Sequence, residues 1–220
     1  MKATKIILAC LLCLVTLCFA GCKSDKNKVA TVSASDDIIV SIYAYDGKGE
    51  SSFGLMNLGH SFLSFENIST ETVMIGDYAL APTETVTIST WCLSDHFGVW
   101  YNIESNYIKY HDKYNGRYSV SMSIKKDKLQ KAKNFIDKNN TWLPTKNCTN
   151  FSIGLWNELC DKDAKLETPL IYTPKKLTDD IKRFDSYEYN KDIFVSSRLG
   201  YFDGETFVQF AFEKALEGVV

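Results

Sequence analysis

The sequence predicts an α+β fold in which an antiparallel β-meander sheet is packed with helices. Runs rich in β-branched and aromatic residues fill much of the first half of the chain, with short turn-like links between them. Amphipathic runs with a helical period follow in the second half. From these two observations we expect an antiparallel sheet of about five strands with helices packed on it.

Five runs are expected to form the strands. The links NISTE and APTE are typical of turns, so consecutive runs should pair in antiparallel fashion. The runs are 38–46, 59–67, 72–80, 85–91 and 117–124. Beyond residue 187 the pattern is less clear: 192–202 indicates a strand, and 207–217 fits a strand or a helix.

Three helices are expected. The run 125–138 places apolar residues on one face and lysines elsewhere. The run 148–159 has a similar apolar face, and the third helix should begin with Thr173 as N-cap and Pro174 at its first position. The apolar faces of the first two helices are Leu129, Ala132, Phe135 and Ile136, and Phe151, Leu155, Trp156 and Leu159.

The N-terminus is typical of an export signal. A basic head with Lys2 and Lys5 precedes an apolar stretch, 6–20, that is too short to span a membrane. The sequence FAGC then resembles a bacterial lipobox, cut before Cys22 and lipidated on its thiol, although Phe19 replaces the usual leucine. An ordinary secretory signal cut nearby is the alternative, and both interpretations export the protein.

These features divide the chain into three parts. Residues 1–22 are the signal peptide and lipobox, and the polar stretch 23–36 is a flexible tether. Residues 37–220 form a single domain with a C-terminal extension after about 187. We therefore expect a protein of the bacterial cell envelope, held in the cell membrane or outer membrane by lipid on Cys22.

Charge and cysteine content narrow the functional classes. A net charge of −2 with mixed signs offers no basic surface, so nucleic acid is not an expected partner. Of seven cysteines, Cys92, Cys148 and Cys160 remain after the signal and anchor, an odd number that leaves a thiol unpaired within the chain. Neither a CxxC pair nor a zinc-like His/Cys spacing occurs there, so we expect no metal site and no cofactor.

Cys148 lies where a nucleophile would lie. The segment PTKNC breaks the chain at Pro144, and the helical period begins at Cys148, where backbone N–H groups and the macrodipole stabilise a thiolate. Lys146 adds positive charge. The alternative is a cysteine packed in the core. Cys160, at the far end of the helix, is explained as core or as a disulfide partner for Cys92.

A nucleophilic cysteine needs a base, and the chain has three histidines. His60 opens the strand GHSFLSFEN directly after Gly59, so a sheet would hold it. His96 and His111 lie in polar, loop-like surroundings, where a solvated histidine is the ordinary interpretation. His60 is therefore the candidate base.

The motifs GHSFLSF around His60 and NCTNFSIGLW around Cys148 resemble the circularly permuted papain-like group. This NlpC-like superfamily branch includes lecithin:retinol acyltransferase and several bacterial cell-wall and lipid-acting relatives, and in it the histidine strand precedes the cysteine helix. The resemblance covers roughly residues 38–185. It implies a permuted papain-like fold with Cys148 as nucleophile and His60 as general base.

The resemblance also implies a third polar residue, on the strand after the histidine, that orients the imidazole. If 59–67 and 72–80 form a hairpin, the residue opposite His60 is Asp77. We therefore expect Asp77 in this role, with Glu66 and Asn67 as substitutes.

Two classes of function follow. The first is a surface-anchored thiol hydrolase that cleaves an amide bond in a peptidoglycan stem peptide or a protein, with lipid acyltransferase or esterase activity as the variant. The second is a non-catalytic cell-surface binding lipoprotein on the same scaffold. An inhibitor or immunity-type lipoprotein is a further possibility that no sequence feature selects.

We predict that Cys22→Ser releases the protein from membranes, because the substitution removes the thiol that carries the lipid. Membrane partition and metabolic fatty-acid labelling measure this. Unchanged labelling and partition would show that the lipobox interpretation is wrong.

Overall fold

The structure is a computed structural model of the 220-residue chain, and it describes residues 36–48, 59–168, 172–194, 196 and 198–211. The predicted signal peptide, the lipobox with Cys22 and the tether up to residue 35 lie outside the described residues. Within the described ranges, no helix combines the length and the apolar character needed to cross a membrane.

An eight-stranded sheet forms the centre of the fold, in the order β10-β9-β6-β5-β2-β1-β7-β8, with antiparallel pairing between neighbours. A separate two-stranded sheet pairs β3 with β4. The strands are β1 (Ile38–Tyr45), β2 (His60–Asn67), β3 (Val73–Ile75), β4 (Tyr78–Leu80), β5 (Thr85–Leu93), β6 (His96–Tyr101), β7 (Tyr118–Ile124), β8 (Glu188–Tyr189), β9 (Gly200–Asp203) and β10 (Thr206–Gln209).

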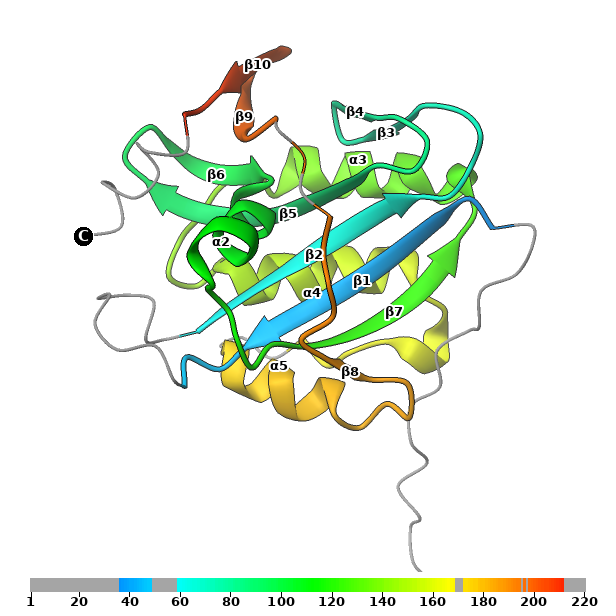
Figure 1. Ribbon diagram of the computed structural model, residues 1–220, viewed down its shortest axis with the longest axis vertical. Coiled ribbons are helices and arrows are strands. Elements are labelled where there is room, and N and C mark those ends of the chain that lie inside the picture. The colour runs from blue at the N-terminus through cyan, green and yellow to red at the C-terminus, as the bar shows by residue number, and fades with distance from the viewer. Residues whose placement is uncertain (1–35, 49–58, 169–171, 195, 197, 212–220) are drawn as a thin grey trace, which may run out of the picture.

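Helices cover both faces of the sheet. On one face lie α3 (Leu129–Lys138), α4 (Cys148–Leu159) and α5 (Pro174–Ile181), and on the other lies α2 (Ile103–His111) (Figure 1). Two short 3₁₀ helices, Lys126–Lys128 and Lys162–Ala164, precede α3 and follow α4. The α+β class and the mostly antiparallel sheet are confirmed.

Strand alternation places the main core between the sheet and helices α3 to α5. In β1, every second side chain from Ile38 to Ala44 is fully buried there, as the period of two requires. The apolar faces expected for α3 and α4 lie in the same core, with Phe135 partly buried against it. The core side chains of β1 are Ile38, Val40, Ile42 and Ala44.

The expected meander is wrong at its third run. Residues 72–80 do not pair with β2, because a turn at Gly76, with φ +62°, divides them into β3 and β4, which pair with each other. Strand β2 pairs instead with β1 on one side and β5 on the other. Strand β6 and helix α2, between residues 96 and 111, were not predicted.

Helix α4 begins at Cys148, as its period predicts. The side chain of Asn147 caps it by accepting hydrogen bonds from the N–H groups of Thr149 at 2.9 Å and Asn150 at 3.2 Å. A capped helix start on a packed helix gives Cys148 a fixed place beside the first residues of β2, a central strand of the sheet.

Strands β2 and β5 diverge next to this helix start. Their pairing runs from Glu66 opposite Thr85 to Leu63 opposite Ile88. Beyond that point, the carbonyl of Ser61 accepts a hydrogen bond from the side chain of Ser89, with 2.7 Å between the oxygens. The divergence therefore opens the sheet beside the first residues of β2.

Between β8 and β9, the described residues 190–194, 196, 198 and 199 cross the α2 face of the sheet (Figure 1). At one end, Lys191 Nζ donates to Ser121 Oγ of β7 at 2.7 Å. At the other, Asn102 Nδ2 donates to the carbonyl of Arg198 at 2.8 Å. Strands β8, β9 and β10 flank this segment, so residues beyond 187 add strands to both edges of the sheet.

Gly59 sets the direction in which the chain enters β2. Its φ is +80°, and a Cβ at this position would lie 2.2 Å from the carbonyl oxygen of Tyr45 and 3.0 Å from the Cβ of Pro174. A side chain at residue 59 would therefore be disfavoured by the left-handed backbone angle, and it would also overlap fixed backbone atoms.

We predict that Gly59→Ala destabilises the protein more than Gly204→Ala does. Gly204 also has a positive φ, +58°, but a Cβ there would meet nothing within 4 Å. The control should cost about 1–2 kcal/mol from the left-handed conformation alone, and Gly59→Ala should add the cost of overlap. Urea unfolding of both variants measures the difference, and equal losses would contradict the steric argument.

Candidate active site

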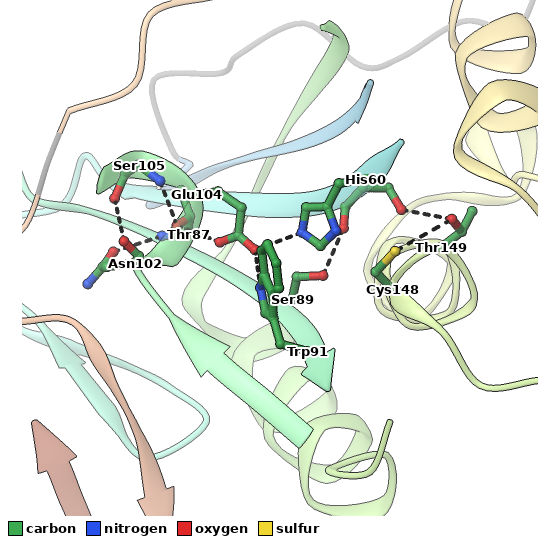
Figure 2. Close-up of polar contacts among 10 residues, drawn as sticks. His60, Thr87, Ser89, Trp91, Asn102, Glu104, Ser105, Cys148 and Thr149 are labelled. Atoms are coloured by element: carbon green, nitrogen blue, oxygen red, sulfur yellow. Dashed lines mark hydrogen bonds and ion pairs between the residues drawn. The ribbon is translucent and has the colours of Figure 1, made fainter. Parts of the chain in front are cut away.

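Three side chains from separate elements meet where β2 and β5 diverge. Cys148 is the first residue of α4, His60 the first of β2, and Glu104 lies in the first turn of α2. Figure 2 shows the imidazole of His60 between the carboxylate of Glu104 and the sulfur of Cys148. The structure thus brings together the nucleophile and base predicted from the sequence, and adds an acid that was not predicted.

Glu104 is a fully buried carboxylate whose two oxygens accept three hydrogen bonds. Its Oε1 accepts from His60 Nε2 at 2.9 Å and from Trp91 Nε1 at 2.7 Å. Its Oε2 accepts from the hydroxyl of Thr87 at 3.0 Å. A carboxylate accepts and cannot donate, so His60 Nε2 carries a proton and Nδ1 is the ring nitrogen left for the thiol.

Aromatic rings hold the imidazole in this orientation. His60 is 6% exposed. Its ring lies 4.3 Å from that of Trp91 and 5.6 Å from that of Tyr114, measured between centroids. Since Trp91 also binds Glu104, one side chain positions both His60 and its carboxylate partner.

The divergence of β2 from β5 explains how the thiol reaches the imidazole. His60 packs with Trp91 on the face of the sheet that carries α2. Cys148 begins α4 on the other face, where Ser61 donates a hydrogen bond to Thr149 Oγ1 at 3.0 Å. The side chains of His60 and Cys148 face each other and interact by charge, across a part of the sheet where the two strands are not paired (Figure 2).

The surroundings of Cys148 favour its thiolate. Burial raises the pKa of the thiol, but the positive charge of His60 and its hydrogen bond outweigh this. The backbone N–H and hydroxyl of Ser61 also stabilise the thiolate, and together these groups lower the pKa of Cys148 to about 7. The residue is half-buried, which leaves part of it open to solvent.

The interaction with Cys148 also raises the pKa of His60. Burial lowers the pKa of the imidazole, whereas the Cys148 thiolate and the Glu104 carboxylate raise it, giving a value of about 9. Between pH values of about 7 and about 9 the thiol is ionised and the imidazole is protonated. The site therefore holds a thiolate–imidazolium pair at and just above neutral pH.

The start of α4 has fewer free backbone N–H groups for an oxyanion than a helix start usually offers. Asn147 occupies the N–H groups of Thr149 and Asn150. The N–H of Cys148 itself makes no hydrogen bond to any residue in the described part of the chain. It is therefore the helix-start donor available to a developing oxyanion.

The predicted third residue is wrong. Asp77 lies in the turn between β3 and β4, where its carboxylate pairs with Lys133 Nζ at 2.9 Å. It does not face His60, because the hairpin on which that prediction rested does not form and Tyr45 lies opposite His60.

The two substitutes for Asp77 lie at the other end of β2. At the usual rise per residue, Glu66 and Asn67 are roughly 20 Å from His60 along the strand. The side chain of Asn67 bonds instead to the carbonyls of Glu71 at 2.8 Å and Leu80 at 2.9 Å.

The remaining cysteines differ from Cys148. All three cysteines of the described residues are free thiols, so Cys92 and Cys160 do not pair. Burial raises the pKa of Cys160, at the end of α4, to about 11, and burial also raises that of Cys92. Of the three cysteines in the described residues, Cys148 is thus the one whose surroundings favour ionisation.

Glu104 was missed because nothing in the sequence pairs it with His60. A local signal was nevertheless present: Glu104 follows the aromatic run FGVWY after two residues. A carboxylate among residues of this kind is buried only when donors satisfy it.

We predict that Glu104→Gln lowers the pKa of His60 and thereby raises that of Cys148, because the carboxylate stabilises the imidazolium. Asp77→Asn is the matched control and should change neither value. NMR titration of the imidazole and the pH dependence of Cys148 alkylation measure the two pKa values. A shift in Asp77→Asn with none in Glu104→Gln would reverse the assignment.

Comparisons with known proteins give no information about the function of this site. No family model, curated protein or solved structure matched the chain. The arrangement of Cys148, His60 and Glu104 is therefore the basis for any functional assignment.

Proposed function

We propose that this protein is a surface-anchored thiol hydrolase with a permuted papain-like arrangement, cleaving an amide or ester bond. The observation that carries the proposal is the series Cys148, His60 and Glu104, in which His60 lies between the other two, is hydrogen-bonded to Glu104, and stabilises the thiolate of Cys148 by its positive charge. Such a series needs three elements that are distant in sequence to converge, and a packed core cysteine requires none of it.

The reaction begins with the thiolate–imidazolium pair. Cys148 sulfur attacks the substrate carbonyl carbon, and the carbonyl oxygen takes the negative charge next to the N–H of Cys148. His60 Nδ1 then gives its proton to the leaving amine or alcohol as the carbon–nitrogen or carbon–oxygen bond breaks. This leaves a thioester on Cys148 and a neutral imidazole.

Water completes the cycle. His60 Nδ1 takes a proton from water, and the hydroxide oxygen attacks the thioester carbonyl. The carbon–sulfur bond breaks, the acid leaves, and the thiolate–imidazolium pair returns. Glu104 keeps the proton on Nε2 throughout, so the ring always presents Nδ1 to the sulfur and the substrate. If an alcohol or amine replaces water, the same steps give acyl transfer.

The buried Glu104 weakens the case for a non-catalytic binding module on this scaffold. That alternative rested on the lack of a clear third polar residue and of a side-chain oxyanion donor before Cys148, and Glu104 supplies the first of these. Export and lipid attachment at Cys22 remain part of the proposal, which would bring the enzyme to peptide, protein or lipid substrates at the bacterial cell envelope.

We predict that iodoacetamide alkylates Cys148 with a rate that rises through a pH of about 7, because the thiolate is the reacting form. In His60→Gln the inflection should move toward the ordinary thiol value of about 8.5. Peptide mapping of the full chain identifies the alkylated residue, and Cys160, whose pKa is about 11, serves as the internal control.

Activity tests the chemistry itself. With p-nitrophenyl acetate, the full chain should form an acetylated protein that mass spectrometry detects, and Cys148→Ala and Cys148→Ser should not. Acylation should rise through a pH of about 7 as the thiolate forms, because the p-nitrophenolate leaving group needs no proton from the imidazolium. A native Cys148 that stays unlabelled until the protein is denatured, with circular dichroism showing an intact fold, would refute the hydrolase.

A further inference from the structure

The surface beside Cys148 has an apolar side. Phe97, at the start of β6, is 57% exposed, and Leu143, in the loop between α3 and α4, is 45% exposed. The N–H of Trp142 donates to the carbonyl of Phe97 at 3.3 Å, which joins the loop to the strand. We refer to Phe97, Trp142 and Leu143 as the apolar rim.

The rim approaches Cys148 along the sheet. Phe97 is directly opposite Cys92 in the β5–β6 ladder, so the two side chains lie on the same face. That face carries α4, since Ile88, four residues before Cys92, is part of the core with α4. Cys92 is also close enough to feel the charge of Cys148: burial raises the pKa of Cys92, and the Cys148 thiolate raises it further.

The rim also approaches Cys148 along the chain. Leu143 forms a backbone bridge with Lys146, two residues before the nucleophile, with N–O distances of 2.9 and 3.3 Å. The capped start of α4 then fixes Cys148 relative to this turn. Strand pairing and the loop bridge therefore both connect the rim to the surroundings of Cys148.

The composition of the rim indicates what it binds. In the loop 139–147, Lys146 is the one charged residue. A substrate carboxylate beside the scissile bond would meet that single exposed cation, whereas an apolar group would contact three large side chains.

We propose that the apolar rim is a specificity subsite for one large apolar side chain next to the scissile carbonyl, and that the substrate is a peptide or protein carrying such a residue. This inference rests on the proposed hydrolase function and narrows its substrate class. Burial of a phenyl ring against the rim should give about a tenfold preference.

The first test uses p-nitrophenyl esters of N-acetylphenylalanine, N-acetylglycine and N-acetylaspartate with the full chain. We expect kcat/KM to be about tenfold higher for phenylalanine than for glycine. Phe97→Ser and Leu143→Ser should each reduce this ratio. Met74→Ser is the matched control, because Met74 is 47% exposed on β3, in the other sheet, and its loss should leave the ratio unchanged.

Three outcomes would overturn the subsite while leaving the hydrolase intact. The first is Cys148-dependent hydrolysis with equal rates for phenylalanine and glycine. The second is a preference for aspartate that Lys146→Ala removes. The third is faster cleavage of p-nitrophenyl octanoate than of the phenylalanine ester, which would assign the rim to a fatty acyl chain.

The second test does not depend on hydrolysis. N-benzyl iodoacetamide should alkylate Cys148 faster than iodoacetamide relative to their rates with free cysteine, and Phe97→Ser should remove this advantage. A benzyl advantage without any ester hydrolysis would refute the hydrolase, and with it the role of the rim in substrate choice, and would leave only an apolar binding surface beside Cys148. No benzyl advantage in the wild-type protein would refute the subsite.

Discussion

The buried carboxylate of Glu104 is the constraint on which the site depends. A negative charge with no exposure to water is tolerated only when donors surround it. Here the donors come from His60, Trp91 and Thr87, so satisfying Glu104 fixes one ring nitrogen of the base and the side chains around it. Because Nε2 is bound to the carboxylate, the imidazole can present Nδ1 alone to the thiol. The orientation of the imidazole that satisfies the buried carboxylate is therefore the same one that turns Nδ1 toward the thiol.

The support for Glu104 is built into the start of α2. Asn102 precedes this helix with φ +67°, is fully buried, and exchanges hydrogen bonds with the backbone of Thr87 at 2.9 and 3.0 Å. The hydroxyl of Thr87 in turn binds Glu104. A left-handed asparagine therefore locks the first turn of α2 to β5 and sets where the carboxylate lies.

The sequence predicted the element starts that local patterns encode, but it did not predict the side-chain partners that depend on long-range pairing. The start of α4 at Cys148 and the strand beginning near His60 follow from helix and strand periods over a few residues. Asp77 was wrong because its role required β2 to pair with 72–80, and that choice of partner is made by the whole sheet. Glu104 was missed for the same reason: α2 and β5 meet through Asn102, an interaction that no local period reports.

The described residues between β8 and β9 connect the start of α2 to β7, near the far edge of the sheet. They are held to β7 by Lys191, and the carbonyl of Arg198 satisfies the side-chain amide of Asn102. A proteolytic cut between these two residues would remove no atom of the site, yet it would release the tie on the residue that anchors α2. The integrity of a surface segment far along the chain is therefore a condition for the placement of Glu104 beside His60, and a nicked chain could lose this arrangement while keeping all three residues.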